Sequence, residues 1–227
     1  MIGPADFIAL LVIASLCSLD TVSVGQTMVS RPIVSATLGA AALGRAEDGL
    51  VVGAVMELFA LETLPFGASR YPEWGAAGVV AATTYVIGGR GSPGSLAFAV
   101  LIGLAVAGLG SISMVWHRRR VAVLAGVLRE ELAIGSAAAV TRLHVTGIAL
   151  DLWRGVLVAS AGLILAFAFT MPVLSRWNIA FGQSLTWPLI LATAVGAAAL
   201  VRCARPMGAI GYLGGGLAVG IVAMVAR

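Results

Sequence analysis

The chain has 227 residues, of which 60% are hydrophobic and 11% are charged, and its mean hydropathy is +1.04. A soluble domain of this length needs far more charge to cover its surface, so the composition excludes an ordinary water-soluble fold. The net charge of +4 does not indicate nucleic-acid binding. The one dense basic cluster, Arg118-Arg119-Arg120, directly follows an apolar run, where basic residues mark the cytoplasmic side of a membrane.

The first half of the chain carries apolar runs that are too short for simple membrane crossings. Residues 7–19 and 32–44 form two such runs, and Glu57 interrupts a third at 49–61. A straight membrane helix needs about 20 apolar residues, and shorter segments are more often re-entrant, broken or buried. Interrupted segments of this kind are typical of transporter binding sites, because irregular backbone at membrane depth needs a cavity around it. We therefore predict short or re-entrant helical hairpins in this half.

Four later runs contain no Asp, Glu, Lys or Arg, and each is long enough to cross the hydrocarbon core as a helix. They lack the period-two alternation of a barrel strand. The predicted fold class is therefore all-α, a polytopic integral membrane protein with several full transmembrane helices. The first segment has no basic n-region, so we expect it to be retained rather than cleaved as a signal peptide. The four runs are 91–116, 155–175, 177–201 and 206–226.

A polar connection at 117–143 separates two membrane halves. It combines charged residues with apolar residues at helical spacing, a pattern that predicts an amphipathic helix along the cytoplasmic interface. The predicted organisation is an N-terminal membrane half at 1–116 with the candidate substrate-site hairpin, this connection, and a C-terminal membrane half at 144–227. The basic cluster at the start of the connection would make 91–116 run inward and 155–175 outward.

Glu57 is the polar residue that most needs an explanation, because ionisable groups inside a membrane are costly and are functional by default. One interpretation is solute contact, since a carboxylate accepts strong charge-assisted hydrogen bonds from sugar hydroxyls. The other is structural, with Glu57 paired with Arg31 or capping a hairpin backbone. Glu62 lies about 140° from Glu57 around an ideal helix. That angle disfavours a paired-carboxylate site and favours an interfacial position for Glu62.

The polar stretch 20–32 lies between two apolar runs and has two interpretations. It is either a solvated loop, or the rim of a cavity to which Asp20 and Gln26 contribute. The residues themselves leave both alternatives open.

His144 and Asp151 precede a later apolar run, together with Arg154. Their spacing would place His144 and Asp151 on one helix face, but interfacial anchoring is the commoner role of such groups. A catalytic His–Asp pair would need a nucleophile, and no G-x-S-x-G or H-E-x-x-H motif supplies one. No cluster has metal-ligand spacing. We therefore predict no catalytic residue, no metal and no cofactor.

Short motifs in a fixed order resemble those of a known family. The ordered set is similar to the enzyme IIC component of the mannose/fructose/sorbose family of the sugar phosphotransferase system, most strongly over 19–90. His144-Val145 with Arg154 resembles a segment of that family's second half. The motifs of the first half are Gln26-Thr27-Met28-Val29-Ser30-Arg31-Pro32-Ile33-Val34, Leu43-Gly44, Gly49-Leu50-Val51-Val52-Gly53-Ala54-Val55-Met56-Glu57-Leu58 and Pro65-Phe66-Gly67-Ala68-Ser69.

This resemblance implies a sugar permease subunit in the bacterial cytoplasmic (inner) membrane, crossing it several times. Its implied partners are the sugar, the enzyme IID membrane subunit, the IIB and IIA phosphocarrier proteins and the lipid membrane, with no nucleic acid. Phosphoryl transfer would belong to IIA and IIB, so the chain itself would not be an enzyme. By motif match, Gln26, Glu57 and Ser69 would face the sugar, with Asp20 nearby. The sequence departs from the family pattern at Arg227, where it ends, because similar proteins continue there by another helix.

Two other functions compete with sugar transport. A degenerate membrane scaffold or sensor would hold a partner in the membrane and would behave normally after Glu57→Gln. A membrane-embedded enzyme would use Glu57, Glu62 or His144, and the purified chain would then turn over a substrate without any phosphocarrier. A permease, by contrast, should lose uptake after Glu57→Gln while still inserting into the membrane.

Overall fold

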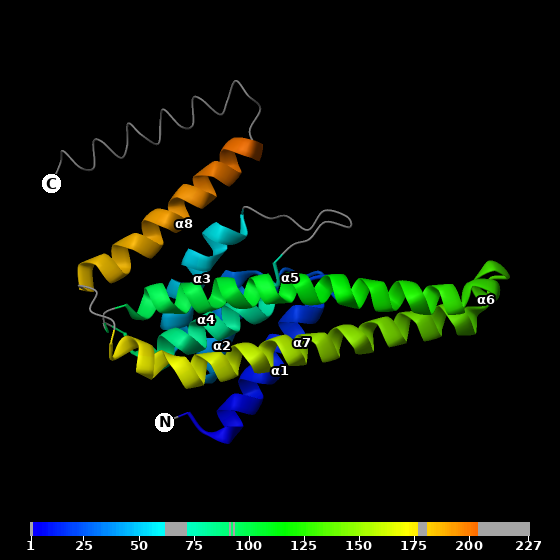
Figure 1. Ribbon diagram of the computed structural model, residues 1–227, viewed down its shortest axis with the longest axis horizontal. Helices are drawn as coiled ribbons and strands as arrows, with labels where there is room; N and C mark the ends of the chain where they lie inside the picture. The colour runs from blue at the N-terminus through cyan, green and yellow to red at the C-terminus, as the bar shows by residue number, and fades with distance from the viewer. Residues whose placement is uncertain (1, 62–71, 91, 93, 177–180, 204–227) are drawn as a thin grey trace.

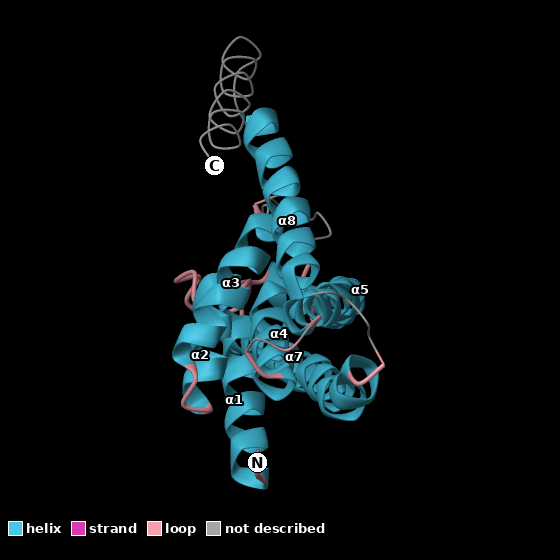
Figure 2. Ribbon diagram, turned by 90° about the vertical axis from the view of Figure 1, so that its left-hand side faces the viewer, coloured by secondary structure: helices cyan, strands magenta, loops and turns pink. Residues whose placement is uncertain are grey.

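The computed structural model describes residues 2–61, 72–90, 92, 94–176 and 181–203 (Figure 1). Within these ranges every regular element is an α-helix and no strand occurs (Figure 2). This confirms the predicted all-α fold. The helices are α1 (Pro4–Asp20), α2 (Pro32–Ala42), α3 (Ala46–Ala60), α4 (Trp74–Gly88), α5 (Ser95–Val127), α6 (Arg129–Ala133), α7 (Ala137–Leu174) and α8 (Phe181–Cys203).

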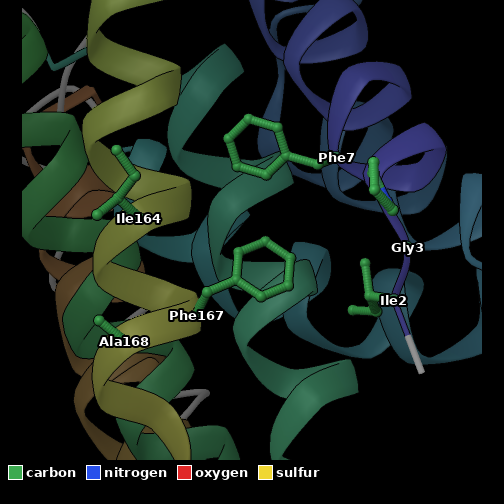
Figure 3. Close-up of a pocket in the computed structure, with 7 residues that line it drawn as sticks. Ile2, Gly3, Phe7, Ile164, Phe167 and Ala168 are labelled. Carbon is green, nitrogen blue, oxygen red and sulfur yellow. The ribbon is translucent and has the colours of Figure 1, made fainter.

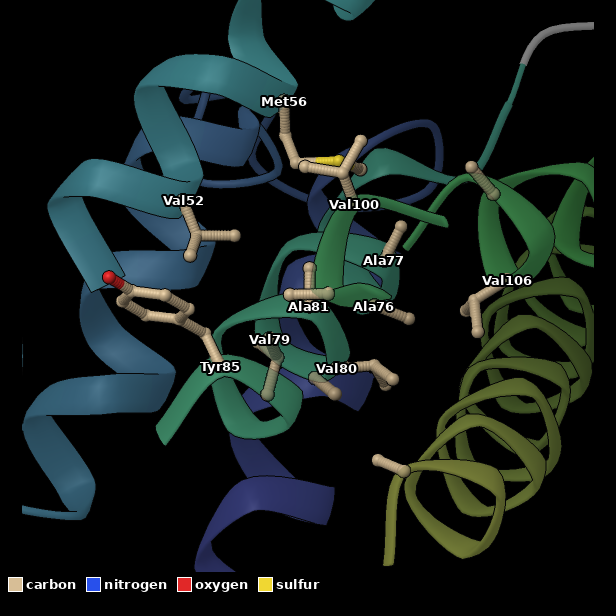
Figure 4. Close-up of a cluster of buried hydrophobic side chains, with 14 of the residues drawn as sticks. Val52, Met56, Ala76, Ala77, Val79, Val80, Ala81, Tyr85, Val100 and Val106 are labelled. Atoms are coloured by element: carbon tan, nitrogen blue, oxygen red, sulfur yellow. The ribbon is translucent and has the colours of Figure 1, made fainter. Parts of the chain in front are cut away.

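Helix α4 lies at the centre of the molecule and packs against α1, α2, α3, α5 and α7. Every residue of α4 from Gly75 to Tyr85 is buried, as expected for a helix that is apolar on all sides. Its small residues meet valines of α3 and α5 and Met56 in one continuous core cluster (Figure 4). Because α4 is held on all sides, its first turn is a fixed reference point for the polar groups around it.

Helices α2 and α3 form the short hairpin that the sequence predicts. Pro32 occupies the first turn of α2, where its missing N–H costs no helix hydrogen bond. The chain reverses at Gly44, whose φ of +70° belongs to the left-handed region that glycine tolerates. The two helices have 11 and 15 residues, or about 16 and 22 Å at 1.5 Å per residue, so neither spans a hydrocarbon core of about 30 Å.

The turn of this hairpin carries its own ion pairs. Arg45 Nη2 lies 2.5 Å from the carboxylate of the buried Asp48, and Arg90, beyond the end of α4, contacts Asp48 at 3.7 Å and Glu47 at 3.2 Å. The turn is therefore tied to the connection that follows α4, at the opposite end of α2 and α3 from Glu57.

Helices α5 and α7 are the two longest elements, with 33 and 38 residues. They run side by side and extend beyond the rest of the bundle to the short α6 (Figure 1). At 1.5 Å per residue they measure about 50 and 57 Å, which exceeds the thickness of a bilayer core. Both are apolar enough to cross a membrane within the described part of the chain.

The predicted amphipathic helix at 117–143 is not a separate element. Helix α5 continues through Arg118 to Arg120 as far as Val127, α6 forms the bend, and α7 starts at Ala137. The reason is local: no glycine or proline interrupts α5 between residues 111 and 125, and Arg, Val, Ala and Leu all continue a helix. The connection is thus the far end of the helical hairpin that α5 and α7 form. We call this far end, from residue 117 of α5 through α6 to the first turns of α7, the α5–α7 arm. The division of the chain at 116 and 143 stays a prediction, and the run 206–226 lies outside the described residues.

Candidate functional site

Asp20, the last residue of α1, fixes the shape of the connection between α1 and α2, here called the 21–31 loop. Its carboxylate accepts hydrogen bonds from the backbone N–H and the hydroxyl of Thr27, both at 2.7 Å, and from the backbone N–H of Ser30 at 3.0 Å. Asp20 is only 7% exposed. An aspartate that accepts from neighbouring backbone groups imposes a local turn, so Asp20 organises this loop from within.

Two residues of the loop hold a backbone conformation that non-glycine residues rarely adopt. The φ angle is +51° at Gln26 and +67° at Met28. Such conformations cost about 1–3 kcal/mol each and cluster at binding sites. Both side chains are exposed, and Gln26 Nε2 donates to the carbonyl of Val22 at 3.2 Å. The loop therefore presents Gln26 at its surface on a strained backbone.

An ion pair closes the open end of the α2–α3 hairpin. Arg31 Nε donates to Glu57 Oε1 at 2.6 Å, and Arg31 Nη2 contacts the same oxygen. The other oxygen of Glu57 accepts from the backbone N–H of Ile33 at 3.2 Å, a first-turn N–H of α2 that has no partner within the helix. The structure thus shows both structural roles that the sequence allowed for Glu57: it pairs with Arg31, and it caps the backbone of the hairpin at Ile33. The side chains of Arg31 and Glu57 are 25% and 20% exposed, so the pair is neither sealed nor fully open.

A second ion cluster is buried where α4 and α7 meet. Arg154 Nη2 lies 2.8 Å from Glu73, the N-cap residue of α4, and Arg154 Nε lies 2.7 Å from Asp151. All three residues are at most 2% exposed. Buried charges persist only when they are paired and fully hydrogen-bonded. We call these three residues the Glu73–Arg154–Asp151 cluster.

Hydroxyl groups complete the hydrogen bonds of this cluster. Ser113 of α5 accepts from Arg154 Nη1 at 3.3 Å. The 21–31 loop supplies the other two hydroxyls: Ser23 donates to Asp151 Oδ2, and Thr21 donates to Glu73 Oε1 at 3.4 Å. The cluster therefore joins the loop, α4, α5 and α7 at one point.

Two glycines allow the helices to come close enough for these contacts. A Cβ atom at Gly110 of α5 would lie 2.1 Å from Glu73 Cβ, and one at Gly155 of α7 would lie 3.0 Å from Ser18 Cβ of α1. The first distance is far below van der Waals contact, so a side chain at Gly110 would displace Glu73. The backbone N–H of Glu73 also donates to the carbonyl of Ala107 at 3.1 Å, which fixes the start of α4 against α5.

The structure describes three of the four residues assigned to the sugar site, Gln26 and Glu57 as sugar-facing and Asp20 as nearby. Asp20 and Gln26 shape and occupy the 21–31 loop, and Glu57 binds Arg31 at the end of this loop. Ser69 lies outside the described residues, as does Glu62. Each of these assignments as a sugar contact stays a prediction.

The sequence interpretation of the second-half residues differs from their positions in the structure. His144 is exposed on the α5–α7 arm, whereas Asp151 and Arg154 are buried rather than anchored at an interface. The spacing of Asp151 and Arg154 could have indicated their ion pair, because side chains three residues apart on a helix lie close enough to pair. The role of Glu73, which directly precedes an uninterrupted apolar helix, was not anticipated.

A groove of about 540 Å³ between α1 and α7 has no polar side chain in its lining (Figure 3). Phe7 and Phe167 face each other across it, with ring centroids 5.9 Å apart. Sugar sites need several convergent polar groups to replace water, so this groove is not a candidate for binding a sugar. The candidate site is the 21–31 loop together with Glu57. The groove is lined by Ile2, Gly3, Pro4, Phe7, Ile164, Phe167 and Ala168.

The solved structures that share this fold include two membrane proteins. One is described as "Structure of membrane protein", with a TM-score of 0.75 and 17% identity, covering 99% of this chain and 94% of the other. The second is a chain from the cryo-EM structure of the mannose transporter ManYZ in complex with microcin E492, with a TM-score of 0.63 and 18% identity, covering 99% and 93%. Together with two helices in the described residues that are long and apolar enough to cross a bilayer, this likeness places the chain in the fold class of helical membrane proteins.

Sequence comparison identifies the family. The sequence model described as the sorbose-specific IIC component of the phosphotransferase system (PTS) matches residues 5–203. The sorbose-specific EIIC component of Klebsiella pneumoniae is 23% identical over 224 residues, which cover 95% of this chain and 81% of that protein. The chain belongs to the PTS sorbose-specific IIC family, the membrane-embedded transport subunits of the sugar phosphotransferase system. The resemblance seen in the ordered motifs is thereby confirmed.

Proposed function

We propose that this chain carries a hexose or related sugar across the bacterial inner membrane and that the sugar binds where the 21–31 loop meets Glu57. The observation that carries this proposal is the Arg31–Glu57 pair: a charged pair on the short hairpin, partly exposed, at the end of a strained loop. A guanidinium and a carboxylate side by side offer donors and acceptors to adjacent sugar hydroxyls. Family membership supports a sugar as the solute.

Within this site the three described residues have different roles. Glu57, with one-fifth of its side chain exposed, accepts hydrogen bonds from sugar hydroxyls, and Gln26 contributes an exposed amide. Asp20 acts indirectly, because its oxygens already accept three hydrogen bonds from the loop. Ser69, by motif match, would complete the site.

The proposed partners follow from the family. An enzyme IID subunit would lie beside the chain in the membrane, and soluble IIB and IIA proteins would phosphorylate the sugar at the cytoplasmic face. The chain itself supplies binding and translocation, and phosphoryl transfer belongs to those partners. The α5–α7 arm, with Arg118 to Arg120, would face the cytoplasm.

The test is Glu57→Gln, which keeps the shape of the side chain and removes its charge. The variant is expressed with its partner subunits in cells without other sugar phosphotransferase systems, and uptake of radiolabelled mannose, fructose and sorbose is measured. We expect at least a tenfold loss of uptake, or about 1.4 kcal/mol, at unchanged membrane insertion. Glu131→Gln, an exposed change on α6, serves as the matched control. Wild-type uptake by Glu57→Gln would support the scaffold or sensor function instead.

A further inference from the structure

The Glu73–Arg154–Asp151 cluster contains two carboxylates and one guanidinium, so its side chains carry more negative than positive charge. Arg154 uses three nitrogens, one each for Glu73, Asp151 and Ser113. These contacts supply one hydrogen bond to each carboxylate. The second oxygen of each carboxylate therefore needs a donor from somewhere else.

The 21–31 loop supplies one donor to the second oxygen of each carboxylate. Ser23 donates to the second oxygen of Asp151, and Thr21 donates to the second oxygen of Glu73. A buried carboxylate oxygen without a donor is costly, because no water replaces the lost bond. The second oxygen of Asp151 thus keeps its Ser23 donor only when the loop lies in the observed position.

The two ends of the loop are held by different groups. Near its start, Thr21 and Ser23 are fixed to α4 and α7 through the buried cluster. At its end, Arg31 is fixed to Glu57 of the hairpin. The residues between these anchors include Gln26 on its left-handed backbone, so the position of the exposed amide depends on both anchors together with the hydrogen bonds from Thr27 and Ser30 to Asp20.

We propose that Ser23 and Arg154 are positioning residues of the sugar site, which they do not touch. Through the Ser23–Asp151 hydrogen bond, the buried cluster sets where the 21–31 loop lies relative to α4 and α7, and thereby sets the geometry of Gln26 and Arg31 toward the sugar. This inference rests on the proposed sugar site, which it extends to residues from the second half of the chain.

The direct test removes one hydroxyl. Ser23→Ala, expressed with the partner subunits, deletes the loop's bond to Asp151 and leaves the ion pairs of the cluster in place. We expect KM for the transported sugar to rise about five- to thirty-fold, which corresponds to about 1–2 kcal/mol, with little change in the maximal rate. Ser175→Ala, an exposed serine at the end of α7, is the matched control. Ser23→Thr keeps a hydroxyl and should restore most of the wild-type KM.

A second measurement does not depend on transport. Met28→Cys, at a position that is 71% exposed, carries a spin label in the reconstituted chain with Cys17 and Cys203 replaced by serine. We expect faster label motion in Ser23→Ala than in the wild type or in Ser175→Ala. Arg154→Lys keeps the charge and loses the planar fork, and should also increase label motion if it inserts normally.

The outcomes separate this inference from the proposed function. Unchanged label motion in Ser23→Ala, or a loss confined to the maximal rate, would overturn the positioning role even if Glu57→Gln abolishes uptake. Normal uptake by Glu57→Gln would overturn the proposed sugar site. The motion of the spin label at position 28 would still show whether the Glu73–Arg154–Asp151 cluster holds the 21–31 loop in place.

Discussion

Arg31 and Glu57 lie 26 residues apart in the sequence and form an ion pair that joins the start of α2 to the last turn of α3. The pair closes a hairpin whose helices are too short to cross a membrane. The carboxylate also caps α2 through the N–H of Ile33. A structural role and a role in binding are compatible here, because one-fifth of the Glu57 side chain remains exposed.

A double-mutant cycle measures the structural interaction between Arg31 and Glu57. Arg31→Gln leaves the partly buried Glu57 without its cation, and we expect the free energy of unfolding in detergent to fall by about 1–2 kcal/mol. The double variant Arg31→Gln/Glu57→Gln should lose less stability than the two single changes added together, because only one interaction is removed. Uptake should be low in all three. Full additivity of the stability losses would show that the two side chains do not interact in the membrane-inserted protein.

Asp20 and Gln26 should respond differently to substitution although they lie close together in the sequence. Asp20→Asn removes the charge that organises the loop, and we expect limited proteolysis within 21–31 to become faster in detergent, because three hydrogen bonds weaken together. Gln26→Ala removes an exposed amide, so proteolysis should stay at the wild-type rate while sugar KM rises. Loop cleavage at the wild-type rate in Asp20→Asn would show that Asp20 does not organise the 21–31 loop.

Gly110 is required by the close approach of Glu73. Gly110→Ala would place a Cβ atom 2.1 Å from Glu73 Cβ, and overpacking of this kind costs about 1–3 kcal/mol. A Cβ atom added at Gly108, on the same helix, would meet no neighbouring segment within 4 Å. Gly108→Ala is therefore expected to be neutral or slightly stabilising. Comparing the thermal midpoints of the two variants checks the packing, and equal midpoints would contradict it.

The short α2–α3 hairpin and the long helices could be predicted from the sequence, because the residues within each segment determine them. Glu57 within an apolar run and Pro32 at its expected helix start indicated the short α2–α3 hairpin, and charge-free runs indicated the long helices. The pairing of Arg31 with Glu57 was one of the predicted alternatives because few other charges are available near a membrane carboxylate.

Other features depend on contacts between distant segments. Arg154 and Glu73 are 81 residues apart, and no spacing rule connects a residue before α4 with the middle of α7. The arm was also missed for a physical reason. An amphipathic pattern at 117–143 fits a helix on a membrane surface and equally a helix that packs against a neighbour, and only the packing of α5 on α7 distinguishes them.

The length of the α5–α7 arm gives a prediction about topology. Residues 117–127 extend α5 by about 16 Å beyond its apolar part, so the end of the arm should lie in water on the cytoplasmic side. In a background with Cys17 and Cys203 replaced by serine, we introduce Val127→Cys or Ile134→Cys, at positions that are 76% and 84% exposed.

Both cysteines should react with a membrane-impermeant maleimide in inside-out vesicles and not in right-side-out vesicles. Leu101→Cys, 54% exposed within the apolar part of α5, is the control and should resist labelling in both, because lipid covers it. Labelling of position 127 only from the outside would reverse the orientation. Protection of position 127 from both sides would show that the arm lies in the membrane or against a partner rather than in water.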